Sequence, residues 1–98
     1  MNEARYQRHL IKRIDHLIPQ AFVIKNDASH IQGIPDILVL YKNMWAMLEI
    51  KIEENSSHQP NQDYYIQLFD GMSFAAFINP DNEEAVLNDI QHAFGIIR

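Results

Sequence analysis

The chain contains no cysteine, which excludes a disulfide framework and any zinc site built on thiolate ligands. It has only three glycines and no glycine-rich phosphate-binding loop, so a nucleoside triphosphatase is disfavoured. No apolar run approaches the length that spans a bilayer, and the first residues do not resemble a signal peptide. Together these absences predict a protein of the reducing cytoplasm with no membrane partner.

Basic residues are in the minority, because eight Lys and Arg stand against 13 Asp and Glu, a formal net charge of −5. This charge argues at first sight against a nucleic-acid partner. The charges are unevenly distributed, however: residues 1–62 are neutral overall, and the acidic excess lies in residues 63–98. Half of the basic side chains fall in the first thirteen residues, namely Arg5, Arg8, Lys12 and Arg13. The length of 98 residues predicts one domain, residues 1–98.

Hydrophobic periodicity divides the chain into helices and strands. An amphipathic helix is indicated by apolar residues at three- and four-residue steps, Tyr6, Leu10, Ile14, Leu17 and Ile18. In a later helix we expect three residues to face the core, Tyr65, Leu68 and Phe69. The expected order is helix 3–18, strand 21–25, a hairpin of strands 37–41 and 45–52, helix 61–71, strand 73–78 and helix 81–94. This order predicts an α/β domain in which helices flank a mixed sheet.

The hairpin carries charged residues in an otherwise apolar stretch. Asp36 precedes its first strand, while Glu49 and Lys51 lie two positions apart on its second strand and are expected on one face. Such side chains are costly to bury unless they are paired or bind a metal. The two carboxylates and the carbonyl oxygen of Ile50 suit Mg²⁺, which prefers oxygen ligands and keeps waters and substrate phosphates in its shell. Lys51 could then orient an attacking water or stabilise charge on a phosphate.

These residues carry a resemblance to a known family. Gly33-Ile34-Pro35-Asp36, followed after a gap by Glu49-Ile50-Lys51, resembles the motif of the PD-(D/E)XK nuclease superfamily. Gln62 and Tyr65 resemble its Gln-x-x-Tyr motif, and residues 70–75 resemble the glycine-containing turn into its last core strand. The expected element order agrees with the αβββαβ core of that superfamily. The chain is most similar to small stand-alone nucleases of the VRR-NUC type, and it is also similar to archaeal-type Holliday junction resolvases.

The resemblance implies a restriction-endonuclease-like fold and a Mg²⁺-dependent DNA endonuclease, for which Mn²⁺ can substitute. The implied products carry a 5′-phosphate and a 3′-hydroxyl, and the implied substrates are structured DNAs such as Holliday junctions or flaps. The implied metal ligands are Asp36, Glu49, the carbonyl of Ile50 and Glu3, and the implied catalytic residues are Asp36, Glu49, Lys51 and Gln62. Compact members of this kind are typical of phages and often form homodimers, so we expect a homodimer in a bacterial or phage-infected cell.

Candidate DNA contacts lie on the basic first helix, in the loop before the motif and on the motif helix: Arg5, Arg8, Lys12, Arg13, His30, Gly33 and Tyr65. Simpler interpretations stay open for most of them. The basic residues could form a solvated helix face, Gly33 could supply a positive φ rather than room for a DNA backbone, and Tyr65 could belong to the core. Glu3 could stabilise the helix dipole instead of a metal.

Two other functions also stay open. The chain could be a catalytically inactive nuclease-fold module that binds DNA or a protein, or an unrelated α/β interaction domain whose acidic C-terminal part docks a basic partner. Cleavage of DNA in Mg²⁺ or Mn²⁺ that stops in EDTA distinguishes the nuclease from both, and a gel shift without cleavage identifies the binding module.

Overall fold

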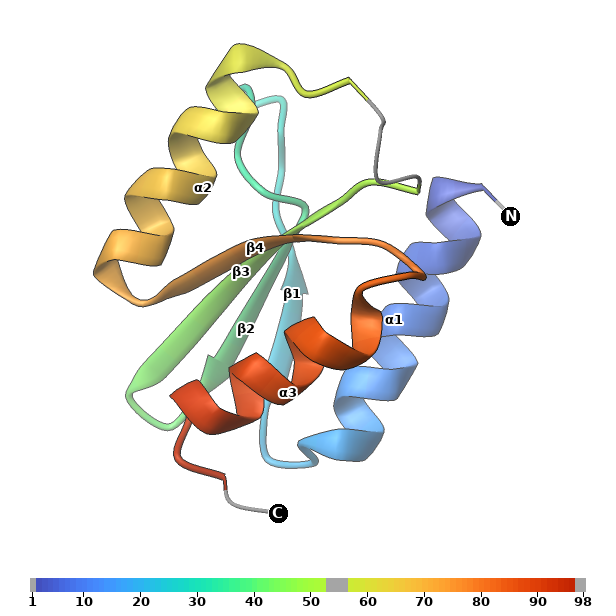
Figure 1. Ribbon diagram of the computed structural model, residues 1–98, viewed down its shortest axis with the longest axis vertical. Helices are drawn as coiled ribbons and strands as arrows, with labels where there is room; N and C mark the ends of the chain where they lie inside the picture. Colours follow the sequence, from blue (N-terminus) through green and yellow to red (C-terminus); the bar gives the residue numbers. More distant parts are fainter. Residues whose placement is uncertain (1, 53–56, 97–98) are drawn as a thin grey trace.

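A computed structural model describes residues 2–52 and 57–96 and confirms the expected α/β order (Figure 1). The elements are α1 (Glu3–Leu17), β1 (Phe22–Lys25), β2 (Ile37–Tyr41), β3 (Met44–Ile50), α2 (Pro60–Met72), β4 (Phe74–Ile78) and α3 (Glu83–Ala93). In the described part of the chain no helix has the length and apolar character needed to cross a membrane.

The four strands form one mixed sheet in the order β1-β2-β3-β4. The pairs β1–β2 and β2–β3 are antiparallel, whereas β3 and β4 run parallel and are joined through the crossover helix α2. A parallel connection requires such a crossover, because a tight turn cannot return the chain to the same end of the sheet. The mixed sheet is therefore a direct consequence of placing one helix between the third and fourth strands.

The helices cover the two faces of the sheet unequally. On one face, α1 and α3 lie side by side and bury the main core with alternate residues of the strands (Figure 1). That core includes Tyr6, Leu10, Ile14, Ile18, Ile37, Val39, Ala46, Leu48, Ile50, Ile78, Val86, Leu87, Ile90 and Phe94. On the other face α2 packs over β3 and β4, and apolar residues of β1 and β2 stay exposed there, namely Phe22, Ile24 and Leu40.

The predicted inner side of α2 is buried less completely than the sequence suggested. Tyr65, Leu68 and Phe69 were expected in the core, but they are only half-buried, and Ile66 is the buried residue of this helix. Tyr65 stacks on Phe69 with 5.6 Å between ring centroids, and Phe69 meets Trp45 edge to face at 6.0 Å. Because α2 covers only part of its sheet face, Tyr65 and Phe69 form a partly exposed aromatic cluster with Trp45 rather than part of a closed core.

The last helix also begins later than predicted, at Glu83 instead of residue 81. The Oδ1 of Asn79 accepts hydrogen bonds from the backbone N–H groups of Asp81 and Asn82, and the Oδ1 of Asn82 accepts one from the N–H of Asn79. Such side-chain contacts to the backbone compete with helical hydrogen bonds. They hold residues 79–82 in a turn and delay the start of α3.

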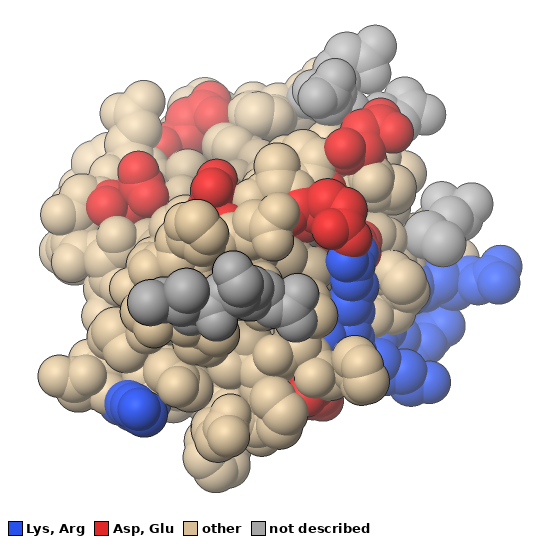
Figure 2. Space-filling view, turned by 60° about the horizontal axis from the view of Figure 1, so that its bottom comes forward, with Lys and Arg blue, Asp and Glu red and all other residues tan. Residues whose placement is uncertain are grey.

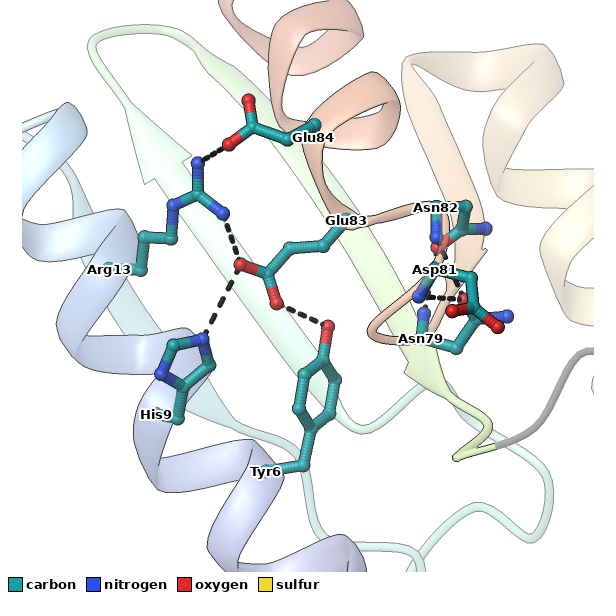
Figure 3. A network of polar contacts seen from close by, with 8 residues as sticks. All are labelled: Tyr6, His9, Arg13, Asn79, Asp81, Asn82, Glu83 and Glu84. Atoms are coloured by element: carbon teal, nitrogen blue, oxygen red, sulfur yellow. Dashed lines mark hydrogen bonds and ion pairs between the residues drawn. The ribbon is translucent and has the colours of Figure 1, made fainter. Parts of the chain in front are cut away.

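A polar network joins α1 to α3 beside the main core (Figure 3). Glu83 is only 5% exposed, and its carboxylate accepts a hydrogen bond of 2.7 Å from the Tyr6 hydroxyl. The same carboxylate forms an ion pair with Arg13, and the Nε2 of His9 lies 3.4 Å from it. Arg13 also pairs with the exposed Glu84. Burial alone would raise the pKa of Glu83, but the contacts with Tyr6 and Arg13 outweigh it, so the pKa lies below its usual value.

Glu83→Ala is expected to lower the free energy of unfolding by about 1–3 kcal/mol, because the buried Tyr6 hydroxyl loses its acceptor. Glu84→Ala is the matched control: it removes a solvent-exposed partner of the same Arg13 and is expected to cost less than about 1 kcal/mol. Urea denaturation measures both values. Equal costs for the two variants would show that the network does not stabilise the contact between α1 and α3.

Candidate metal and nucleic-acid site

The strand register brings Asp36 and Glu49 together at one end of the sheet. Ile37 pairs with Leu48, so the next residues beyond this pair, Asp36 and Glu49, lie opposite each other. Residues opposite each other in an antiparallel pair project from the same face, and here that face is the one covered by α2. The Oδ2 of Asp36 accepts a hydrogen bond of 2.9 Å from the backbone N–H of Ile50, which fixes the Asp36 carboxyl beside β3.

Glu49 is held by a contact from α2 and is only 4% exposed. Its Oε2 accepts a hydrogen bond of 2.9 Å from the Nε2 of Gln62 on the first turn of α2. Its Oε1 is buried and has no hydrogen-bond partner in the described part of the chain. An unpartnered buried carboxylate oxygen is costly, so this oxygen is the one available to a cation.

In the free protein the pKa values of both carboxyl groups are raised, which disfavours ionisation. Burial raises the pKa of Glu49 to about 8, and the neighbouring charges of Asp36 and Glu3 add to the increase, whereas Lys51 opposes it. Burial likewise raises the pKa of Asp36, although the Ile50 N–H and Lys51 counteract it. Two like charges in a desolvated site need a positive partner, and a divalent cation would supply it.

A pocket of about 270 Å³ lies between Asp36 and α1. It is lined by Glu3, Ala4, Gln7, Asp36 and Ile50. The first turn of α1 therefore lies near Asp36, and Glu3 lines the same pocket as that carboxylate. Gln7 was missed by the sequence analysis; the available signal was its position one helical turn after Glu3, since residues four apart share a helix face.

The donor set fits a hard divalent cation, although it is not a complete cage. Across residues 2–52 and 57–96, no three acidic or histidine side chains are grouped so that they alone could hold a metal ion. Mg²⁺, however, is typically held by one or two carboxylates and keeps water and phosphate ligands. The unpartnered Oε1 of Glu49 and the adjacent Asp36 satisfy that smaller requirement.

Lys51 directly follows β3, which ends at Ile50. The backbone N–H of Lys51 donates a 2.9 Å hydrogen bond to the carbonyl of Ile78 on β4. The positive charge of Lys51 opposes the pKa increase of both Asp36 and Glu49.

The loop before the motif is fastened to the start of α2. Asn61 Nδ2 donates a 3.0 Å hydrogen bond to the carbonyl of Gln32. Gly33 next to it has a φ of +89°, and a Cβ there would lie 2.6 Å from the Cγ of Asn61. Both the backbone conformation and the approach of Asn61 therefore require glycine, without any nucleic acid. His30 is exposed on the same loop.

The basic residues of α1 separate into two groups. Arg5, Arg8 and Lys12 are exposed, and Figure 2 shows Lys and Arg side chains gathered on the side of the molecule that α1 occupies. Arg13 is different, because its guanidinium is engaged by Glu83 and Glu84 (Figure 3). The structure thus assigns Arg13 to the contact between α1 and α3, and the candidate DNA contacts on this helix are reduced to the other three.

The comparisons with known proteins agree with this geometry. No protein-family model matches the chain, and no curated protein matches it. A solved structure described as a VRR_NUC domain matches with a TM-score of 0.70 over 88% of this chain and 94% of that chain, at 22% sequence identity. At that level of identity the similarity establishes the architecture, and the chemistry has to be argued from the residues. The chain therefore has the restriction-endonuclease-like fold of a VRR-NUC nuclease domain, as its motifs predicted.

Proposed function

We propose that this protein is a Mg²⁺-dependent endonuclease that hydrolyses DNA phosphodiester bonds. One observation carries the proposal: the carboxylates of Asp36 and Glu49 converge in a desolvated site, and an oxygen of Glu49 has no partner there among the residues that the structure describes. That arrangement destabilises the free protein unless a cation binds, which is how a binding site differs from a structural contact. The similarity of the fold to a VRR_NUC domain structure adds support.

The proposed ligands of Mg²⁺ or Mn²⁺ are Asp36, Glu49 and the carbonyl of Ile50, with Glu3 as an additional oxygen donor from α1. The bound ion would polarise the phosphoryl group and lower the pKa of a coordinated water. Lys51 orients the attacking water and offsets negative charge that develops on the phosphate. Gln62 holds the Glu49 carboxylate in one orientation through its 2.9 Å hydrogen bond, in the way that outer-shell groups orient metal ligands.

The DNA is proposed to lie across the N-terminal part of α1, where its phosphates contact Arg5, Arg8 and Lys12. These cations are exposed on α1, the same helix that contributes Glu3 to the pocket. With three such contacts binding should weaken steeply with salt. The net charge of −5 leaves little attraction elsewhere on the surface, so the substrate is proposed to be recognised by shape, as in a branch or flap. Tyr65 supports α2 beside the site rather than touching DNA, because it stacks on Phe69.

A homodimer is also proposed, so that two sites can cut two strands. Its support is the apolar half-face of the sheet that α2 leaves uncovered, where Phe22 is 73% exposed and Ile24 and Leu40 lie close by in the register. Contiguous apolar residues on a sheet face commonly mark an interface.

A second function is favoured by one observation: the described residues lack a group of three acidic or histidine ligands. A binding module with the same fold would grip DNA or a protein through α1 and leave the strands intact. The decisive experiment incubates labelled four-way junction, flap, nicked and plain duplex DNA with the protein in Mg²⁺, Mn²⁺ or EDTA. A nuclease cuts at least one shape in either metal and none in EDTA, whereas a binding module retards DNA without cutting it.

Cation binding can be tested without any substrate. Mn²⁺ at ten times its dissociation constant is expected to raise the midpoint of thermal unfolding by about 5–10 °C, because the ion binds only the folded site. The double variant Asp36→Asn/Glu49→Gln should show no such increase, and Asp81→Asn/Asp89→Asn, which neutralises two exposed carboxyls, should respond like the wild type. An equal response in all three proteins would place the cation elsewhere.

A further inference from the structure

A second polar pair lies beside the candidate site and has no role in the chemistry above. His58 precedes α2, and its Nδ1 is 2.9 Å from the Oδ1 of Asp63 in the first turn of that helix. The His58 ring also stacks on Phe77 with 4.0 Å between ring centroids and 23° between ring planes. The imidazole is therefore fixed by two contacts: the Asp63 carboxylate at one ring edge and the Phe77 ring against its face.

The sheet register places Phe77, the residue on which this imidazole stacks, next to Glu49. Phe77 on β4 is the direct partner of Glu49 on β3, so the two side chains project from the same sheet face on adjacent strands. Asp63 follows Gln62, the residue that donates to Glu49. His58, stacked on Phe77 and joined to Asp63, thus lies on the α2 side of the carboxylates, whereas the basic residues of α1 lie on the opposite side.

The contact with Asp63 determines which ring nitrogen faces outward. When Nδ1–H donates to the Asp63 carboxylate, Nε2 at the other edge of the ring is the nitrogen left for a partner. The protonated imidazole presents Nε2–H, a charged donor suited to a phosphate oxygen. A purely structural function would be to fasten the segment before α2 to the first turn of the helix.

We propose that His58 contacts the DNA backbone, with Nε2 donating a hydrogen bond to a phosphate oxygen of a strand bound beside Asp36 and Glu49. Asp63 is its positioning residue. The inference rests on the proposed function in that the partner is a nucleic-acid strand, but it does not require that the strand be cut. The strand would then be held from both sides of the carboxylates, by α1 on one side and by His58 on the other.

The test measures DNA binding by fluorescence anisotropy, with labelled duplex and flap DNA, in EDTA so that no strand is cut. His58→Ala is expected to weaken binding about tenfold, equivalent to about 1.4 kcal/mol. His58→Gln keeps a donor without the charge and should lose less affinity. Asp63→Asn should bind within about threefold of the wild type, because the stack on Phe77 still holds the ring. His92→Ala, an exposed histidine in the last turn of α3, is the matched control and should bind like the wild type.

Thermal unfolding of each variant separates a DNA contact from a structural contact. If His58→Ala and Asp63→Asn lose stability and affinity to the same extent, the pair is structural and the inference is overturned. It is also overturned if His58→Ala binds DNA as tightly as the wild type, or if the wild type binds no DNA. Binding that depends on His58, together with no cleavage in Mn²⁺, would overturn the nuclease proposal and leave this contact standing.

Discussion

Lys51→Ala is expected to reduce the rate of DNA cleavage by about 10²–10⁴-fold while the fold is retained. Groups that assist proton transfer or stabilise developing charge contribute factors of that size. Lys51 is the positive charge whose effect reaches both Asp36 and Glu49. It is also half-buried, directly after β3, so the alanine variant loses a charge from within the site.

Single-turnover cleavage of the preferred DNA shape in Mn²⁺ measures the effect. The matched control is Lys42→Asn in the turn between β2 and β3, at the opposite end of the hairpin. Lys42 has a φ of +55°, a conformation that asparagine tolerates well, so the substitution removes a charge without straining the turn. Normal cleavage by Lys51→Ala would remove this residue from the mechanism, and comparable losses in both variants would indicate a general effect of charge.

Glu49→Gln is expected to have two opposite effects, a loss of cleavage and a gain in stability. Cleavage should fall at least about 10²-fold, because loss of a metal ligand costs more than loss of an outer-shell group. The gain in stability follows from the raised pKa. Burial in the folded protein raises the pKa of Glu49 from its ordinary 4.5 to about 8. Between those values the folded state holds more protons than the unfolded state.

The free energy of unfolding of the wild type should therefore decrease as the pH rises from about 4.5 to about 8, and level off above that. Glutamine is neutral throughout, so Glu49→Gln should be more stable than the wild type by a few kcal/mol at pH 8.5, and nearly equal to it at pH 4. Urea denaturation in EDTA across this range measures the difference. Asp89→Asn, on the exposed side of α3, is the control and should show no such pH-dependent gain. A destabilised Glu49→Gln at pH 8.5 would mean that Glu49 is already ionised and well paired in the free protein.

The sequence was sufficient for the order of the elements and for the position of the site. Apolar periodicity located α1 and the hairpin within a few residues, because one face of each element is buried and the repeat survives in the sequence. Asp36 and Glu49 could be identified as candidates because a carboxylate in or beside an apolar strand is costly to bury unless it is paired or binds a metal. These features depend on neighbours within a few positions along the chain, and the structure agrees with them.

Contacts between distant segments could not be read in the same way. Arg13 looked like one more residue of a basic stripe, and its engagement by Glu83 and Glu84, about seventy residues away, depends on how α3 lies against α1. The same is true of Gln7 in the pocket and of His58 stacked on Phe77. The sequence by itself determined which residues carry charge into the apolar sheet. Only the tertiary structure decided which of those charges are paired, since pairing is set by strand register and helix packing, and it left one oxygen of Glu49 with no partner among the described residues.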